Sequence, residues 1–225
     1  EGDLLGEFGE ERRAVITIRE VPDMMKEAIL AAEDERFYQH GGVDYLSIAR
    51  AALSNLSSGT QQGAGTITMQ VARNFFLTRE KTLTRKLREV LLAWKIEANL
   101  TKDEILELYV NQIFLGQRAY GFAAAAQIYF GKPLKDLSPA EAAMLAGLPK
   151  APSAFNPVTN PKRAKIRQEY VLRRMHDLRY LSDAEHEQAR NAPLAIRQGV
   201  RESVPVRAAF VAEMARQVVF EAYGE

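Results

Sequence analysis

Apolar residues recur at intervals of three and four along most of the chain between positions 21 and 192, which is the spacing of one face of an α-helix. The pattern predicts a mainly α protein. Its first long helix is expected to begin at Asp23, because Pro22 interrupts any upstream helix and Asp23 can cap the new one, and to run to about Gln39. Helix breaks are expected in segments rich in glycine, proline or polar residues, which are Gly41-Gly42, 57–65, the region of Thr78, 99–101, Gly116, 131–133 and 149–161.

The two ends of the chain carry different patterns. Residues 4–20 alternate weakly between apolar and polar, with 14–18 as the strongest strand signal, so we expect a short β-hairpin or an extended arm there. Beyond Pro205, residues 206–223 are expected to form a final helix whose apolar stripe has no evident partner. We therefore divide the chain into an N-terminal arm at 1–20, one large domain at 21–200 and a terminal segment at 201–225.

Composition argues against several classes of protein. The 30 Lys and Arg residues nearly balance the 29 Asp and Glu residues, so an anionic partner must be met by a local cluster of charge. The absence of cysteine excludes a disulfide framework and a thiolate metal site, and three separated histidines argue against a histidine metal site. No apolar run approaches the roughly 20 residues that span a bilayer. Because the chain begins at Glu1 rather than Met, we interpret it as a piece of a longer protein.

One acidic residue stands out because of its neighbours. Glu33, in the stretch EDERFYQHGGVD at 33–44, is expected near the end of the first helix, with Ile29 and Phe37 one turn to either side. A glutamate considered alone is more often a solvated surface residue. An acid with apolar neighbours beside a helix–turn–helix corner is instead a candidate for chemistry, because a cleft can open there.

A second group of residues combines an acid with several cations. In the helical stretch REKTLTRKLREVLLAWKIEANL at 79–100, Arg85 and Lys86 precede Glu89 by four and three positions, which is also typical of an ordinary solvated helix face. One face of this helix is apolar, formed by Leu83, Leu87, Val90, Leu91, Trp94 and Ala98. Six basic residues lie within 16 positions, namely Arg73, Arg79, Lys81, Arg85, Lys86 and Arg88. Such a cluster beside a carboxylate suits a phosphate or diphosphate, with a divalent cation as a further candidate ligand of the carboxylate.

A glycine-rich turn, GAGTITMQVARN at 63–74, lies between these two groups. Gly63 and Gly65 allow close approach of the backbone to a ligand, and Thr66 can cap the following helix, whose N-terminal N–H groups favour an anion. The turn is not a P-loop, because no Gly-Lys-Ser/Thr follows and no strand precedes it. The segment SSGTQQGAG at 57–65 is either a linker or a mobile loop over a site.

Taken together, these blocks resemble a known family. In order and spacing they are similar to the signature motifs of the peptidoglycan glycosyltransferase domain, glycosyltransferase family 51, of class A (bifunctional) penicillin-binding proteins of the 1A type. The blocks are EDERFYQHGGVD (33–44), GAGTITMQVARN (63–74), RKLRE (85–89), KDEILELYVN (102–111), YGFAAAAQIYFGK (120–132) and LSPAEAAMLAGLPKAPSAFNP (137–157). The resemblance covers roughly 21–200. Only the second block departs clearly from the family, which has GGSTITQQ where this chain has Ala64, Gly65 and Met69.

The resemblance implies a lysozyme-like helical glycosyltransferase that polymerises lipid II into β-1,4-linked glycan strands, with inversion and release of lipid diphosphate, for bacterial cell wall synthesis. It implies that Glu33 is the general base, whose proton affinity its apolar flanks would raise. It implies that Glu89 is catalytic at the diphosphate, where it would bind a divalent cation (Mg²⁺ or Mn²⁺) or orient Lys86. The substrate-binding residues that it implies are Thr66, Gln70, Arg73, Lys81, Arg85, Lys86 and Asn111.

Four further residues are expected to support the site without taking part in the reaction. Asp34 is expected to be structural, and His40 to be a hydrogen-bonded corner residue. Tyr109 and Asn111 are expected to pack and hydrogen-bond behind the site. Two roles are therefore expected for Asn111, substrate binding and structural support.

The implied partners are lipid II, the growing lipid-linked glycan chain, the membrane surface and phosphoglycolipid inhibitors such as moenomycin, with neither nucleic acid nor an organic cofactor. The resemblance places the domain on the outer, periplasmic face of the bacterial cytoplasmic (inner) membrane. The arm at 1–20 would then follow a membrane anchor, and 201–225 would begin a linker toward a transpeptidase domain. No Ser-x-x-Lys, Lys-Thr-Gly or Lys-Ser-Gly motif occurs in these residues, so the transpeptidase half is not among them.

One segment is expected to meet the membrane. Asn74 to Thr78 places Phe75 and Phe76 beside the basic cluster, where they would enter the headgroup region, or alternatively close the core as a hydrophobic staple.

Two other functions remain open at this point. A peptidoglycan-cleaving lysozyme-like hydrolase or lytic enzyme would also use a glutamate beside an apolar wall, but it has no diphosphate for the basic cluster to neutralise. A non-catalytic helical domain that binds anionic lipid or a partner protein would need the cluster and not Glu33.

Overall fold

Helices form most of the structure, a computed structural model that describes residues 12–58, 65–76 and 83–197. The α-helices are α1 (Asp23–Glu33), α2 (Tyr45–Ser58), α3 (Ile67–Phe76), α4 (Leu83–Glu97), α5 (Lys102–Gln112), α6 (Phe122–Phe130), α7 (Pro139–Ala146), α8 (Pro161–Asp177) and α9 (Asp183–Asn191). The shorter elements are the 3-10 helices η1 (Ile18–Glu20), η2 (Phe37–Gln39) and η3 (Leu134–Asp136) and the strands β1 (Arg12–Arg13) and β2 (Ala119–Tyr120). The expected mainly α fold is confirmed.

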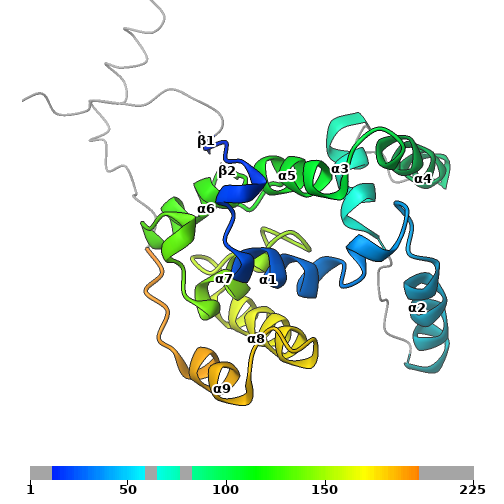
Figure 1. Ribbon diagram of the computed structural model, residues 1–225. Coiled ribbons are helices and arrows are strands. Elements are labelled where there is room, and N and C mark those ends of the chain that lie inside the picture. The colour runs from blue at the N-terminus through cyan, green and yellow to red at the C-terminus, as the bar shows by residue number, and fades with distance from the viewer. Residues whose placement is uncertain (1–11, 59–64, 77–82, 198–225) are drawn as a thin grey trace, which may run out of the picture.

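Two groups of helices enclose the core (Figure 1). One group contains α3, α4, α5 and α6, the other contains α1, α7, α8 and α9, and α2 stands at one side. Helix α1 packs against α7 and α8, while α3 packs against α4 and α5. The main apolar cluster draws fully buried side chains from both groups, among them Ile29, Phe37, Ile67, Leu106 and Leu145. Three of these lie within or next to segments that carry the expected chemistry, so the core holds those segments in place.

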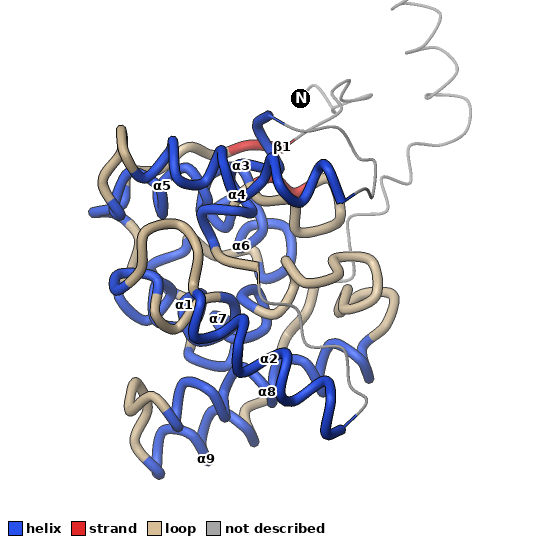
Figure 2. The backbone as a smooth tube through the Cα atoms, turned by 90° about the vertical axis from the view of Figure 1, so that its right-hand side faces the viewer, coloured by secondary structure: helices blue, strands red, loops and turns tan. Residues whose placement is uncertain are grey.

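Strand structure in the described residues is confined to one short pair (Figure 2). β1 runs parallel to β2, with Arg12 opposite Ala119 and Arg13 opposite Tyr120. From Arg12 to the start of η1 the chain pairs with a distant segment. The first strand and the turn of the expected hairpin would lie before Arg12, outside the described residues, so the choice between hairpin and extended arm stays a prediction. The strand signal at 14–18 is misplaced, since the strand precedes it and η1 begins at Ile18. Local alternation cannot show that the partner of a strand is distant in sequence.

The first helix ends earlier than predicted. α1 stops at Glu33, and Asp34 adopts a non-helical conformation with φ −161° and ψ 77°. The reason is tertiary, because the Asp34 carboxylate accepts a hydrogen bond from the backbone N–H of Ile67, at the start of α3. The next long helix begins at Tyr45, where the Asp44 carboxylate caps it by accepting the N–H of Ser47 at 3.0 Å. Glu33, expected near the end of this helix, is its last residue.

Some predicted features lie outside the described residues. They are most of the 57–65 loop, Arg79 and Lys81, the helix at 206–223 and the side chains of Phe75 and Phe76. Within the described part of the chain, no helix is both long enough and apolar enough to cross a membrane.

Candidate active site

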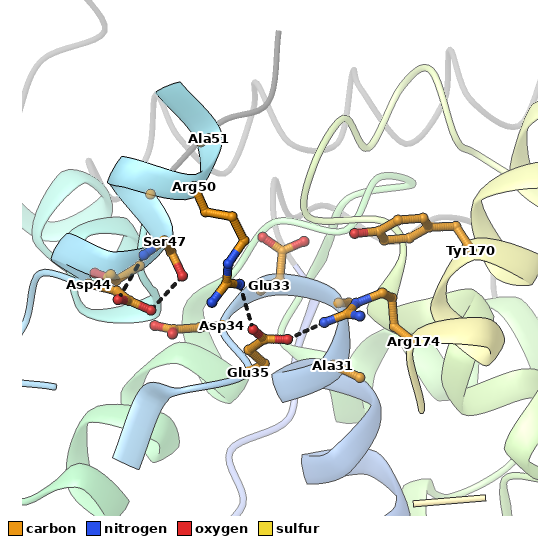
Figure 3. A pocket seen from close by; sticks show the side chains of 13 residues that line it. Ala31, Glu33, Asp34, Glu35, Asp44, Ser47, Arg50, Ala51, Tyr170 and Arg174 are labelled. Atoms are coloured by element: carbon orange, nitrogen blue, oxygen red, sulfur yellow. Dashed lines mark hydrogen bonds and ion pairs between the residues drawn. The ribbon is translucent and has the colours of Figure 1, made fainter. Parts of the chain in front are cut away.

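A cleft of about 410 Å³ opens at the C-terminal end of α1 (Figure 3). Its walls come from α1 and the residues that follow it, from the first half of α2, from the start of α3 and from α8. The lining residues are Ala31, Ala32, Glu33, Asp34, Glu35, Asp44, Ser47, Arg50, Ala51, Gly65, Thr66, Tyr170 and Arg174. The early end of α1 thus places three consecutive acids in one cleft.

Glu33 is held from two sides. Its side chain is only 10% exposed. The amide Nε2 of Gln70, on α3, donates a hydrogen bond to Oε2 at 2.9 Å. The guanidinium Nη2 of Arg167, on α8, lies 3.4 Å from Oε1. Helices from both groups therefore fix the orientation of this carboxylate at the cleft.

The environment of Glu33 suits a base. Burial raises the pKa of the Glu33 carboxyl above its ordinary value. The hydrogen bond from Gln70 and the positive charges of Arg167, Lys150 and Arg73 act in the opposite direction but do not cancel the effect of burial. A carboxylate whose pKa moves toward the working pH is a stronger base while it still ionises. This increase in the pKa of Glu33 is the change that the sequence predicted from its apolar flanking residues.

Asp34 and His40 form a structural corner. Asp34 is 7% exposed and accepts hydrogen bonds from the Ile67 N–H at 3.0 Å and from His40 Nε2 at 2.9 Å. The pair joins the end of α1 to the start of α3 and to the turn before α2. Both residues therefore lie in the supporting positions expected from the sequence.

Thr66 caps α3 as predicted. Its hydroxyl accepts the N–H of Met69 at 3.2 Å and donates to the carbonyl oxygen of Gly42. Although Thr66 lines the cleft, its hydroxyl is already engaged in joining α3 to the turn at Gly42. A substrate that binds the Thr66 hydroxyl must therefore share it with the two hydrogen bonds that this hydroxyl already makes.

The departures in the second block have structural counterparts. Met69 is 3% exposed and packs with Val43 and Ala93 in a small apolar cluster, a position that suits an apolar side chain. Gly65 lines the cleft, and a Cβ atom built there meets nothing within 4 Å. The cleft thus has open space where the family has serine.

Glu89 is not part of an ordinary solvated helix face. It is 1% exposed, with Arg85 Nε 3.2 Å from Oε1 and Lys86 Nζ 3.2 Å from Oε2. The side chain of Lys86 remains 53% exposed, so its ammonium is both anchored by Glu89 and open to solvent. The arrangement presents a fixed cation at the surface of α4.

The geometry of Glu89 does not fit a metal ligand, because each carboxylate oxygen already faces a cationic side chain. In the described residues, the one group of three metal-compatible side chains is Asp34, His40 and Asp44, which does not include Glu89. The three side chains bind other groups of the protein, since Asp34 pairs with His40 and Asp44 caps α2 through Ser47. We therefore derive no step through a metal ion.

Helix α3 links the surroundings of the two glutamates. Gln70 reaches Glu33, and Arg73, one turn later, is exposed and close enough for its charge to act on Glu33. On the side facing α4, Thr68 donates to Glu97 at 2.6 Å. The structure thus joins Gln70 and Arg73 to Glu33, and Arg85 and Lys86 to Glu89, as two clusters on packed helices.

The expected substrate contact of Asn111 is not supported. Its amide accepts the N–H of Ile16 at 3.0 Å and donates to the carbonyl oxygens of Ile16 and Glu107 at 2.8 and 2.9 Å. These bonds use the amide to hold the N-terminal arm against α5. The structure therefore favours the second expectation, that Asn111 hydrogen-bonds behind the site.

Sequence reasoning missed Arg167. It is 7% exposed on α8, where it falls among the buried positions Ala164, Val171 and Met175. A basic residue on an apolar helix face was the available signal, but α8 contains several other arginines and lysines that obscured it.

A second missed feature is a set of ion pairs in the lining of the cleft. Glu35 forms ion pairs with Arg50 on α2, at 2.9 Å, and with Arg174 on α8 (Figure 3). The cleft therefore presents cationic groups from two helices beside its acids.

Comparisons with known proteins agree with this geometry. The model of the transglycosylase family matches residues 1–176. The chain is 56% identical to penicillin-binding protein 1A of Neisseria meningitidis, an alignment that covers 100% of this chain and 28% of that protein. It is 59% identical to a Cupriavidus necator protein whose name describes a transglycosylase, covering 81% of this chain and 79% of that protein.

A solved structure is also similar. The crystal structure of penicillin-binding protein 1A from Haemophilus influenzae matches with a TM-score of 0.61 and 32% identity, covering 100% of this chain and 23% of that chain. The chain thus spans about a quarter of the length of the penicillin-binding proteins that it matches.

Proposed function

The chain belongs to the transglycosylase family, and on that premise we propose that it polymerises lipid II into β-1,4-linked glycan strands for the bacterial cell wall. The observation that carries this proposal is the buried carboxylate of Glu33, held between Gln70 and Arg167 at the wall of a cleft. Burial and a raised pKa are the properties that a general base requires.

In the proposed reaction, Glu33 accepts the proton of the 4-hydroxyl of the acceptor sugar. The oxygen attacks the anomeric carbon of the donor from the face opposite the leaving group, and the bond between that carbon and the lipid diphosphate breaks with its electron pair on the diphosphate. The configuration inverts, and the proton stays on Glu33 until solvent removes it.

The leaving diphosphate gains negative charge, and in this proposal the basic residues on α4 stabilise it. Lys86 projects an exposed ammonium, and Glu89 fixes that ammonium together with Arg85. In this proposal Glu89 acts by orienting two cations rather than by holding Mg²⁺ or Mn²⁺. Arg73 on α3 would add positive charge, as would Lys81, which lies outside the described residues. Phosphoglycolipid inhibitors such as moenomycin, which carry a phosphate, would bind there as well.

A membrane contact is supported by exposed apolar side chains on α4. Leu87, Leu91 and Trp94 follow one another at spacings of four and three residues and are 61%, 51% and 45% exposed. The same helix carries Lys86 and the exposed Arg88. An apolar stripe beside cations suits the interface of an anionic membrane, where the lipid tail of the substrate resides. We therefore propose that the domain works at the outer face of the bacterial cytoplasmic membrane.

The function is tested by incubating the protein with lipid II in detergent and separating the products by size. Polymer that a muramidase digests to disaccharide units supports the proposal. Cleavage of preformed glycan strands, with no polymer formed from lipid II, would instead favour a lysozyme-like hydrolase. Binding to anionic lipid without either reaction would favour a non-catalytic lipid-binding domain.

A further inference from the structure

Arg167 occupies a position that packing alone does not explain. It comes from α8, yet its guanidinium reaches the C-terminal end of α1, where Nη2 lies 3.4 Å from both the Ala32 carbonyl oxygen and Glu33 Oε1. Its Nε donates to the carbonyl oxygen of Gly147, at the end of α7, at 3.3 Å. The guanidinium carbon also lies 4.6 Å from the ring centroid of Tyr170. Three helices and a stacked ring therefore hold a single buried cation against the carboxylate.

Gly147 makes room for this arrangement. Its φ of −77° is accessible to any residue, so its backbone conformation does not require glycine. A Cβ atom at this position would, however, lie 2.9 Å from Cγ of Arg167, which is too close for an unstrained contact. Because Cγ is near the base of the side chain, an added methyl group would displace the whole arginine. The path of Arg167 to Glu33 thus depends on the small residue at position 147.

We propose that Arg167 is a positioning residue for Glu33, which fixes Oε1 at the cleft and keeps the carboxylate ionised at the pH of the reaction. The inference rests on the proposed role of Glu33 as general base. A buried carboxylate without a nearby cation takes up a proton and can no longer act as a base, so the cation sets the lowest pH at which the base works.

Other groups act on Glu33 and stay constant in the test. Arg73 on α3 and Lys150 after α7 contribute positive charge, and Gln70 contributes a hydrogen bond. From α5, the Tyr109 hydroxyl lies within the field of Glu33, and its pKa is raised mainly by burial and further by that negative charge. The acid limb of the pH profile is the pH range in which activity falls because Glu33 takes up a proton. With the other groups unchanged, a shift of this limb to another pH reports on Arg167.

The test measures kcat/KM for polymerisation of lipid II as a function of pH in wild type, Arg167→Met and Arg167→Lys. Loss of an opposite charge at this distance should move the acid limb of Arg167→Met up by about one pH unit. At pH values below the acid limb, the activity of Arg167→Met would then be roughly tenfold lower than that of wild type. The difference in activity would shrink as the pH rises. Arg167→Lys, which keeps the charge but loses the fork of donors, should keep the limb in place and lose activity equally at all pH values.

Two further variants keep the test decisive. Gly147→Ala should move the limb in the same direction as Arg167→Met, and adding it to Arg167→Met should move the limb no further, because both changes act through one contact. Arg163→Met removes an exposed arginine one turn earlier on α8 and should leave the limb in place. Circular dichroism melting curves identify any variant that fails to fold, and if Arg167→Met does not fold, the acid limb of Gly147→Ala decides the test.

An acid limb that stays at the wild-type pH in Arg167→Met and in Gly147→Ala, with activity lowered equally at all pH values, would show that Arg167 is merely structural and overturn the inference. A wild-type protein that forms no polymer at any pH would overturn the proposed function, and the inference with it. Polymer from wild type, with an unmoved limb in Arg167→Met and Gly147→Ala, would overturn only the role of Arg167.

Discussion

At the scale of single residues, the ionised carboxylate of Glu33 is expected to lower the stability of the folded protein. Folding raises the pKa of its carboxyl, mainly through burial, so the folded state binds the proton more tightly than the unfolded chain does. Burial of the ionised form therefore costs free energy of folding at pH values above the folded pKa, and this cost disappears as the pH falls through that pKa. A neutral side chain of the same shape should remove the cost.

Glu33→Gln is accordingly expected to melt at a temperature no lower than wild type at neutral pH, as measured by calorimetry. The difference between the two proteins should shrink at acidic pH, where Glu33 is itself protonated. Melting several degrees below wild type at neutral pH would mean that the ionised carboxylate stabilises the fold on balance.

The residues of the site differ in how visible they are in the sequence. Glu33, Gln70 and Glu89 lie in short motifs whose order and spacing indicated them, and the structure places each in a cluster with other candidates. Arg167 could not be assigned in the same way, since it acts across a distance of more than a hundred positions and its partners are mostly backbone carbonyl oxygens. Asn111 was given two roles because a motif shows which residue matters and not which atoms it contacts.

At the scale of elements, the apolar face predicted for α4 mostly points to solvent. Periodicity found the face, but it could not show that Leu87, Leu91, Trp94 and Ala98 are exposed. Among the side chains of α4 that the structure describes, the buried ones are Glu89, Ala93 and Ile96. The ends of elements were also set by tertiary contacts. Asp34 ends α1 by accepting a bond from α3, and β1 finds its partner in β2, so neither boundary follows from local pattern.

The exposed apolar side chains of α4 lead to a prediction about membrane binding. Leu87→Ser combined with Leu91→Ser should lower binding to anionic liposomes severalfold in a sedimentation assay, because it removes apolar area that would enter the interface. The melting temperature should change by no more than a few degrees, as is usual for exposed positions.

The matched control is Ile166→Ser on α8, which replaces an isoleucine that is 67% exposed on a different helix. It should bind liposomes as wild type does. Equal binding by wild type and the α4 variant would move the membrane contact elsewhere, with the segment at Phe75 and Phe76 as the alternative already indicated by the sequence.

At the scale of the whole molecule, the described part of the N-terminal arm, residues 12–20, is joined to the helical domain. β1 pairs with β2, and the backbone of Ile16 and Ile18 is held by the side chains of Asn111 and Glu107 on α5. Residues 12–18 are therefore joined to the group of helices that contains α5 and α6.

Asn111→Ala tests this connection. It leaves the N–H and carbonyl groups of Ile16 without their partner, which should lower the free energy of unfolding by about 1–3 kcal/mol in urea denaturation. KM for lipid II should stay at the wild-type value under conditions where the variant is folded. A raised KM with unchanged stability would restore Asn111 to the substrate-binding residues.

The assignment of Glu33 as general base is tested most directly by the rate of lipid II polymerisation in wild type and Glu33→Gln at equal concentrations of folded protein. Removal of a general base should lower the rate by roughly 10²- to 10⁴-fold, while the melting curve shows that the fold is intact. A Glu33→Gln variant that polymerises lipid II within about twofold of the wild-type rate would contradict that assignment.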